Sequence, residues 1–224
     1  MVKTCKYLKV LKQICIFCSC LFVLGGCATQ NEPMPEIVYN PGYKPVVTPP
    51  PIVETKPSEE YSYGNIPRAW LPPSGVEKQW SAIIIHHSAT EKGNVAIIDK
   101  WHRENNGWEG IGYDFVIGNG TDSGDGQVET TFRWSQQITG AHCKTPDNWA
   151  NVDGIGICLV GNFNNSRPSE RQMQSLVKLV NFLQKRYKIP QSRIYGHGTT
   201  PGAHVTDCPG NLFSMARFKS MLGS

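Results

Sequence analysis

A run of branched apolar residues, "SAIIIHH" at 81–87, is the feature that most constrains how this chain can fold. Three successive isoleucines without a charge predict a buried β-strand. The run ends in two histidines, His86 and His87, where a strand would reach its end. Successive strand side chains point to opposite faces of a sheet. We therefore expect that the two histidines do not bind the same metal ion.

Strands and helices are predicted to alternate through the rest of the domain. The clearest helix is 169–188, where Ser169 and Gln172 match a capping box and an apolar stripe follows. Such interleaving is typical of a single α/β domain with a central mixed sheet flanked by helices, which we place at residues 67–224. Further helices are expected at 94–106 and 211–222, and further strands at 112–118, 126–134, 154–163 and 193–198.

The first 26 residues have the pattern of a secretory signal. Four lysines are followed by an uncharged apolar stretch that is too short to span a bilayer as a stable helix. The stretch ends in "LGGC", in which small residues precede Cys27. This resembles the bacterial lipoprotein signal, so residues 1–26 are expected to be removed and Cys27 to be lipidated. The alternative is an ordinary signal peptide with an incidental cysteine.

Residues 27–66 are expected to form a tether between the lipidated cysteine and the domain. Eight of the sixteen prolines fall between Pro33 and Pro57. Such a segment favours extended, water-solvated backbone and does not pack a core. It would let a membrane-anchored domain search for a partner away from the membrane.

Charge and cysteine content narrow the functional classes. The chain has a formal net charge of +4, but four lysines lie in residues 1–26, which have no acid, so residues 27–224 are neutral. A nucleic-acid partner is therefore not supported. After the signal and the anchor, three cysteines remain: Cys143, Cys158 and Cys208. Since three is odd, at least one is free, metal-bound or paired with another chain.

The segment "YGHGTTPGAHVTDCPG" at 195–210 carries the strongest chemical signal. Its loop is long enough to bring His197 and Cys208 to one point. With one histidine from the first strand, the site would have two imidazoles and a thiolate, and three protein ligands with an open position describe a catalytic zinc site. The alternative is a disulfide from Cys208 to Cys143 or Cys158, with the histidines scattered over the surface.

Residues 81–210 resemble the zinc-dependent N-acetylmuramoyl-L-alanine amidases, the family shared by phage amidase-type lysozymes and peptidoglycan recognition proteins. The resemblance covers nearly the whole predicted domain, and the order of its motifs is more specific than any one of them. The matching segments are "IIHHSAT" (84–90), "WHRENNGWEGIGYDFVIGNG" (101–120), "TGAH" (139–142), "GIGICLVGNF" (154–163), "QMQSLVKLV" (172–180) and "GHG…TDCPGN" (197–211).

The resemblance implies one Zn²⁺ ion held by His86, His197 and Cys208. The family's active-site tyrosine falls on Tyr113, in the "IGYDF" segment. Thr206 occupies the position two before the cysteine, where family members have lysine or threonine.

The chain departs from the family pattern at two places. His197 and Cys208 are eleven positions apart, which is longer than the usual family spacing and leaves His204 as an alternative ligand. A related branch has a catalytic glutamate in "IGIEL", where this chain has Cys158. The glutamate mechanism is therefore absent at that position.

The implied reaction is hydrolysis of the amide between N-acetylmuramic acid and L-alanine in peptidoglycan. A hydroxyl from Tyr113 or Thr206 would stabilise the developing oxyanion. Substrate contacts are expected from Trp108, Arg133, Trp134 and Trp149, and from His142, which is a groove residue in the family. Taken without the resemblance, a strand tyrosine is usually packing, a threonine before aspartate is usually turn chemistry, and an arginine is usually a solvated charge.

The main alternative function is a non-catalytic peptidoglycan-binding lipoprotein. Because family members that only bind often lack a zinc ligand, the presence of all three favours the enzyme. A third hypothesis is a structural lipoprotein held by disulfides. We expect a monomer in the bacterial envelope, and Ala28 after Cys27 favours the outer membrane, facing the periplasm, if the host is Gram-negative. The sequence leaves open the general base, the preferred stem peptide, the cellular role and the state of Cys143 and Cys158.

Overall fold

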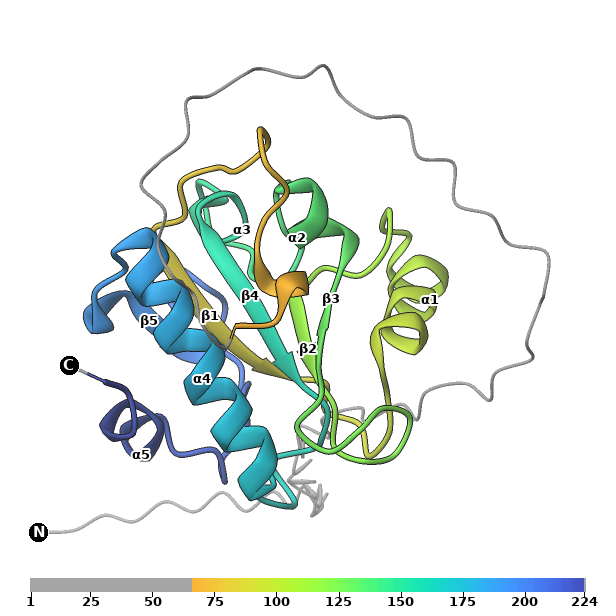
Figure 1. The fold of residues 1–224 in the computed structure, drawn as a ribbon. Helices are drawn as coiled ribbons and strands as arrows, with labels where there is room; N and C mark the ends of the chain where they lie inside the picture. The colour runs from red at the N-terminus through yellow and green to blue at the C-terminus, as the bar shows by residue number, and fades with distance from the viewer. Residues whose placement is uncertain (1–65, 224) are drawn as a thin grey trace, which may run out of the picture. The chain divides into compact units, whose positions relative to one another are not determined.

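A computed structural model of the protein describes residues 66–223, which form a mixed five-stranded sheet with helices on both faces (Figure 1). The predicted signal peptide, the lipidation site Cys27 and residues 27–65 of the predicted tether lie outside the described residues. Ile66 already packs against the hydrophobic core. None of the helices within 66–223 combines the length and apolar character that a membrane crossing requires.

The strand order is β3-β2-β4-β1-β5. At the centre, β1 (Ala82–His87) runs parallel to β4 (Gly154–Leu159) on one side and to β5 (Ile194–Gly196) on the other. β2 (Phe115–Ile117) is parallel to β4, and its other neighbour β3 (Val128–Thr130) is the antiparallel edge. The predicted α/β class with a mixed sheet is confirmed.

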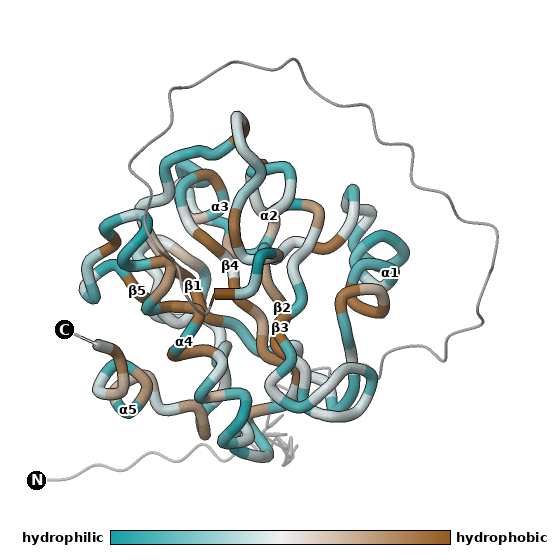
Figure 2. Tube along the Cα trace, viewed as in Figure 1, coloured by the Kyte–Doolittle hydropathy of each residue, from teal (hydrophilic) through white to brown (hydrophobic). Residues whose placement is uncertain are grey.

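Alternation along β1 divides the core into two layers. Ile83 and Ile85 face the larger layer, where they join the apolar side of α4, including Leu176 and Leu183. Ala82 and Ile84 face the other side and pack with Cys143 and Ala150. Figure 2 shows the apolar residues concentrated on the central strands. The helices are α1 (Val95–Asn106), α2 (Phe132–Gln136), α3 (Trp149–Val152), α4 (Glu170–Tyr187) and α5 (Met215–Ser220).

The predicted capping box begins α4. The Ser169 hydroxyl accepts from the Gln172 main-chain N–H, and the Gln172 side chain accepts from the Ser169 N–H. The Gln172 amide also donates to the carbonyls of Ile117 and Val160, at 3.2 and 2.8 Å. The start of the helix is therefore fixed to the ends of β2 and β4.

Two predicted strands are shorter than expected. The predicted strand 126–134 ends at Thr130, because the Thr131 hydroxyl accepts from the Arg133 N–H and starts α2. The predicted strand 112–118 is ordered as a strand only from Phe115. Before it, the N–H groups of Ile111 and Gly112 donate to side chains of α1 instead of a neighbouring strand.

Three further predicted elements are also shorter. The predicted strand 193–198 is limited to Ile194–Gly196, because a 3-10 turn begins at His197. The predicted strand 154–163 ends at Leu159. The predicted helix 211–222 begins only at Met215, where the Ser214 side chain caps α5. The short helix α3 was not predicted, since four residues are too few for a helical period to be visible.

Candidate active site

The end of β1 places its two histidines in different surroundings. His86 turns toward His142 and Cys208. This face of the sheet is also covered by α1 and α3. His87 turns to the other face, where its Nδ1 accepts from the Phe163 N–H at 3.1 Å and its ring contacts the Phe163 ring. The two rings therefore lie on opposite faces of the sheet, as strand alternation predicts, and only His86 faces the cluster of candidate ligands.

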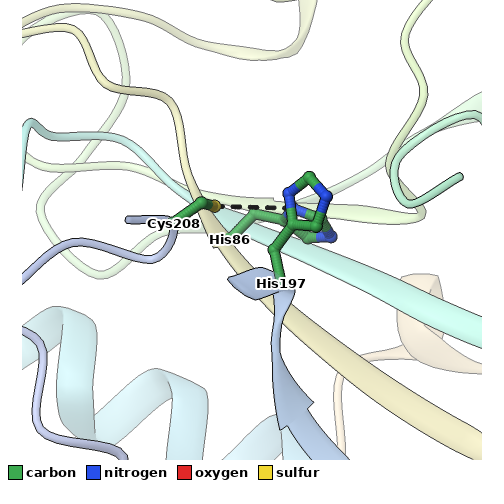
Figure 3. A group of neighbouring side chains, drawn as sticks. All are labelled: His86, His197 and Cys208. Carbon is green, nitrogen blue, oxygen red and sulfur yellow. Dashed lines mark hydrogen bonds between the residues drawn. The ribbon is translucent and has the colours of Figure 1, made fainter. Parts of the chain in front are cut away.

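Three side chains from different elements converge on one point (Figure 3). His86 ends β1, His197 begins the short 3-10 turn after β5, and Cys208 lies in the following loop. One ligand atom from each lies within 4.8 Å of the other two, and the Cys208 Sγ is 3.7 Å from the His86 Nδ1. His204 is not in this group. Its exposed ring lies beside His197, with centroids 5.2 Å apart.

The loop between His197 and Cys208 is closed by main-chain contacts. The Gly198 N–H donates to the Cys208 carbonyl at 2.8 Å, and the Cys208 N–H donates to the Thr206 hydroxyl at 3.2 Å. A Cβ at position 198 would lie 2.1 Å from the Thr206 carbonyl, so only glycine allows this approach. The loop therefore brings a distant cysteine beside the end of β5.

Within residues 66–223 all three cysteines are free thiols. Cys158 pairs in register with His86 across β4 and β1. Cys158 contributes, after burial, to the raised pKa of the Tyr113 phenol. Cys158 therefore lies beside the candidate tyrosine, at the position where a related branch of the family has glutamate. No disulfide removes Cys208 from the cluster.

Burial determines the protonation of the three candidate ligands. It lowers the pKa of His86 well below its usual value, and His142 lowers that pKa further. It lowers the pKa of His197 to about 4, with His204 acting in the same direction. Both imidazoles are therefore neutral near pH 7 and have a free lone pair. Burial also raises the pKa of the Cys208 thiol to about 12.

These residues fit a zinc ion. Two neutral imidazoles and one thiolate are a donor set typical of zinc, and three protein ligands leave a position open. Among the described residues, the His197 Nε2 is buried without a hydrogen-bond partner. A buried polar atom of this kind normally has one. A nearby dication would also offset the cost of ionising the buried Cys208 thiol.

Tyr113 lies against the candidate ligands. Its ring centroid is 5.0 Å from that of His86. Burial, and secondarily Cys158, raises the pKa of its phenol well above the usual value. The hydroxyl therefore stays protonated and can donate a hydrogen bond.

His142 lies behind His86. Its Nδ1 is 3.1 Å from the His86 Nε2, and its own Nε2 is 3.3 Å from the Gly154 carbonyl. Only 7% of the residue is exposed. This leaves little surface for the substrate contact that the sequence predicts for His142, which stays a prediction.

His102 of α1 also borders this site and is not among the residues predicted from the sequence. Its ring is 5.5 Å from that of Tyr113 and 4.7 Å from that of Trp108, and its Nδ1 accepts from the Gly112 N–H. Burial lowers its pKa to about 4. The available signal was helical spacing, because His102 follows the buried Ile98 by four positions and so lies on the same side of the helix.

The other predicted substrate contacts differ in their exposure. Trp108 is 39% exposed beside His102, so its ring is available at the surface. Arg133 is buried, and its guanidinium donates to the main-chain carbonyls of Ile111 and Thr139. A role for Arg133 in binding a peptide carboxylate stays a prediction.

Comparison with known proteins gives consistent similarities. A family model described as N-acetylmuramoyl-L-alanine amidase matches residues 77–211. Peptidoglycan-recognition protein SC2 of Drosophila melanogaster is 32% identical over 147 residues, which cover 61% of this chain and 72% of that protein. An N-acetylmuramoyl-L-alanine amidase of Sus scrofa is 32% identical over 127 residues, which cover 55% of this chain and 19% of that protein.

Solved structures show the same likeness. The N-acetylmuramoyl-L-alanine amidase LysC from Clostridium intestinale URNW is 28% identical, with a TM-score of 0.53, and the match covers 69% of this chain and 93% of that one. The endolysin LysCS from the same source is 29% identical, with a TM-score of 0.52 over 63% of this chain and 82% of that one.

Proposed function

The chain belongs to the N-acetylmuramoyl-L-alanine amidase family, and from this premise we propose that it is a zinc-dependent hydrolase of peptidoglycan. The bond that it cleaves is the amide between N-acetylmuramic acid and the L-alanine of the stem peptide. The observation that carries the proposal is the convergence of ligand atoms from His86, His197 and Cys208 within 4.8 Å, with the Tyr113 ring packed against His86.

The protein residues have separate roles in this proposal. His86, His197 and Cys208 would hold one Zn²⁺, which when bound supplies a Lewis acid and lowers the pKa of water. Tyr113 would donate a hydrogen bond to the amide oxygen as negative charge develops on it. Thr206 is a second candidate donor: its hydroxyl oxygen accepts from the Cys208 N–H, which leaves its own O–H free to donate.

The proposed binding surface includes Trp108. Its half-exposed ring offers an apolar face, which suits a sugar ring. Trp134, by contrast, is buried in the core and has no free face. Among the predicted substrate contacts, Trp108 is therefore the one best supported by its exposure.

A second candidate function is peptidoglycan binding without hydrolysis. The similarity to peptidoglycan-recognition proteins supports binding of this polymer. The complete set of three donor atoms favours hydrolysis over binding alone, because a site used only for binding does not need an open metal position.

Metal analysis and digestion of muropeptides together test the proposal. We expect the purified domain to hold about one zinc per chain and to release free stem peptides. Chelation should stop the release, and added Zn²⁺ should restore it. A domain without zinc would contradict the metal site, whereas zinc without peptide release would favour the binding protein.

A further inference from the structure

A line of three hydrogen-bonding contacts runs from the backbone of β4 into the candidate metal site. The Gly154 carbonyl is 3.3 Å from the His142 Nε2, and the His142 Nδ1 is 3.1 Å from the His86 Nε2. The other nitrogen of His86, Nδ1, faces the Cys208 Sγ. Each imidazole in this line thus uses both of its nitrogens.

The chemistry of the groups fixes the direction of the line. A carbonyl oxygen only accepts, so the His142 Nε2 has to carry a hydrogen. In a neutral imidazole the other nitrogen is then an acceptor, so the His142 Nδ1 needs a donor. That donor is the His86 Nε2–H. Since a neutral His86 carries only this hydrogen, its Nδ1 has a free lone pair.

Two glycines allow the His142 ring to pack closely against the backbone. A Cβ at Gly140 would lie 2.6 Å from the His142 Cδ2, and a Cβ at Gly156 would lie 2.5 Å from the same atom. The Asn151 side chain accepts from the His142 N–H at 2.8 Å and fixes the backbone. Two glycines and an asparagine therefore hold the ring in one place and orientation.

We propose that His142 is a positioning residue. Its ring is oriented by the Gly154 carbonyl and accepts a hydrogen bond from His86, which fixes the Nε2–H tautomer of the His86 ring. The tautomer presents the Nδ1 lone pair toward Cys208 and His197. The tautomer itself follows from the hydrogen bonds, whereas its consequence for zinc affinity rests on the proposed function. Partners of this kind orient metal-binding histidines and raise the basicity of the ligand atom.

Nitrogen NMR of the metal-free protein tests the tautomer without activity or zinc. Long-range ¹⁵N–¹H spectra distinguish a protonated Nε2 from a protonated Nδ1. We expect His86 and His142 both to carry the hydrogen on Nε2. A His86 ring protonated on Nδ1 would overturn the proposal, and so would rapid exchange between the two forms.

The zinc affinities of two His142 variants test whether the His86 tautomer affects metal binding. His142→Leu removes the acceptor for His86 and should raise the zinc Kd by about 10- to 100-fold. His142→Asn can place an amide oxygen near the original Nδ1 and should restore much of the affinity. His87→Asn is the matched control on the other face of β1, and its zinc Kd should stay near that of the natural protein.

The outcomes separate this proposal from the proposed function. If the natural protein binds no zinc, the zinc site fails, and the NMR result still decides the tautomer. If the natural protein binds zinc and His142→Leu binds it equally well, the positioning role is wrong while the zinc site stands. Circular dichroism of each variant shows whether a loss of zinc reflects unfolding.

Discussion

His86 and His87 are neighbours in the chain, yet the pleat of β1 gives them unrelated surroundings. His86 meets Cys208 and His142 on one face, whereas His87 accepts from the Phe163 N–H on the other. A single-residue difference along the strand thus decides which imidazole faces the candidate metal site.

Substitutions on the two faces of β1 should affect zinc binding differently. We expect Cys208→Ser to lose most of the bound zinc and most of the amidase activity, because a serine hydroxyl is a poor zinc ligand at neutral pH. His87→Asn should retain both, since an amide oxygen can still accept from the Phe163 N–H. The measurements are metal content and stem-peptide release, and equal zinc loss in the two variants would contradict this choice of ligand.

Loss of the Tyr113 hydroxyl should lower the rate of the reaction without changing zinc binding. Tyr113→Phe keeps the ring against His86 but removes the donor. We expect kcat to fall by about 10²- to 10³-fold while the zinc content stays the same, as for loss of one oxyanion donor. Steady-state kinetics with metal analysis checks this. An unchanged kcat would assign Tyr113 to packing.

At the scale of the elements, a helix cap ties α4 to the sheet. The capping box starts α4 next to the ends of β2 and β4, and the Ser169 hydroxyl also contacts Asp125. We expect Ser169→Ala to lower the free energy of unfolding by about 1 kcal/mol, because one helix N–H loses its acceptor. Urea denaturation measures this. A loss of zinc in this variant would show unexpected coupling between α4 and the site.

Asp114 joins β2 to β4 and should make stability depend on pH. Its Oδ2 accepts from the Gly156 N–H, and among the described residues its buried Oδ1 has no partner. Burial raises its pKa from 3.8 to about 7, against the opposing effects of the Gly156 hydrogen bond and of Lys78 and Arg133. The folded protein therefore holds a proton, between those two pH values, that the unfolded chain has released.

The sign of the effect follows from this linkage. The stability contributed by protonated Asp114 is complete below its unfolded pKa of 3.8 and is lost as pH rises through about 7. We expect the free energy of unfolding to fall, relative to that of Asp114→Asn, by up to about 4 kcal/mol between acidic and mildly alkaline pH. Urea denaturation of both proteins measures the difference, and parallel pH profiles would contradict it.

At the scale of the whole molecule, the question is how the enzyme would be attached to a membrane. We propose that Cys27 is lipidated and holds the domain in the bacterial envelope through the proline-rich tether. Acyl chains contribute about 0.8 kcal/mol for each buried methylene, so their loss should release the protein. We expect the natural protein in the membrane fraction and Cys27→Ser in the soluble fraction. Mass spectrometry of the N-terminus is the second measurement, and an unmodified cysteine would contradict lipidation.

Much of the domain could be predicted because its signals are local. The isoleucine run predicts β1, and Ser169 with Gln172 predicts the start of α4. The misplaced boundaries depend on distant partners. The N–H groups of Ile111 and Gly112 are bound by Asp99 and His102 of α1, and no local pattern predicts that these residues leave the sheet.

The sequence by itself determined the α/β class, the family and the short list of candidate ligands, because hydrophobic period and motif order are properties of the chain. Only the tertiary structure decided which atoms meet. It joined His86 to Cys208 across 122 positions and set His142 behind His86, with its ring against Gly156. It also turned Arg133 inward to two main-chain carbonyls. These contacts join segments far apart in the chain, so their geometry arises only when the sheet and its loops pack together.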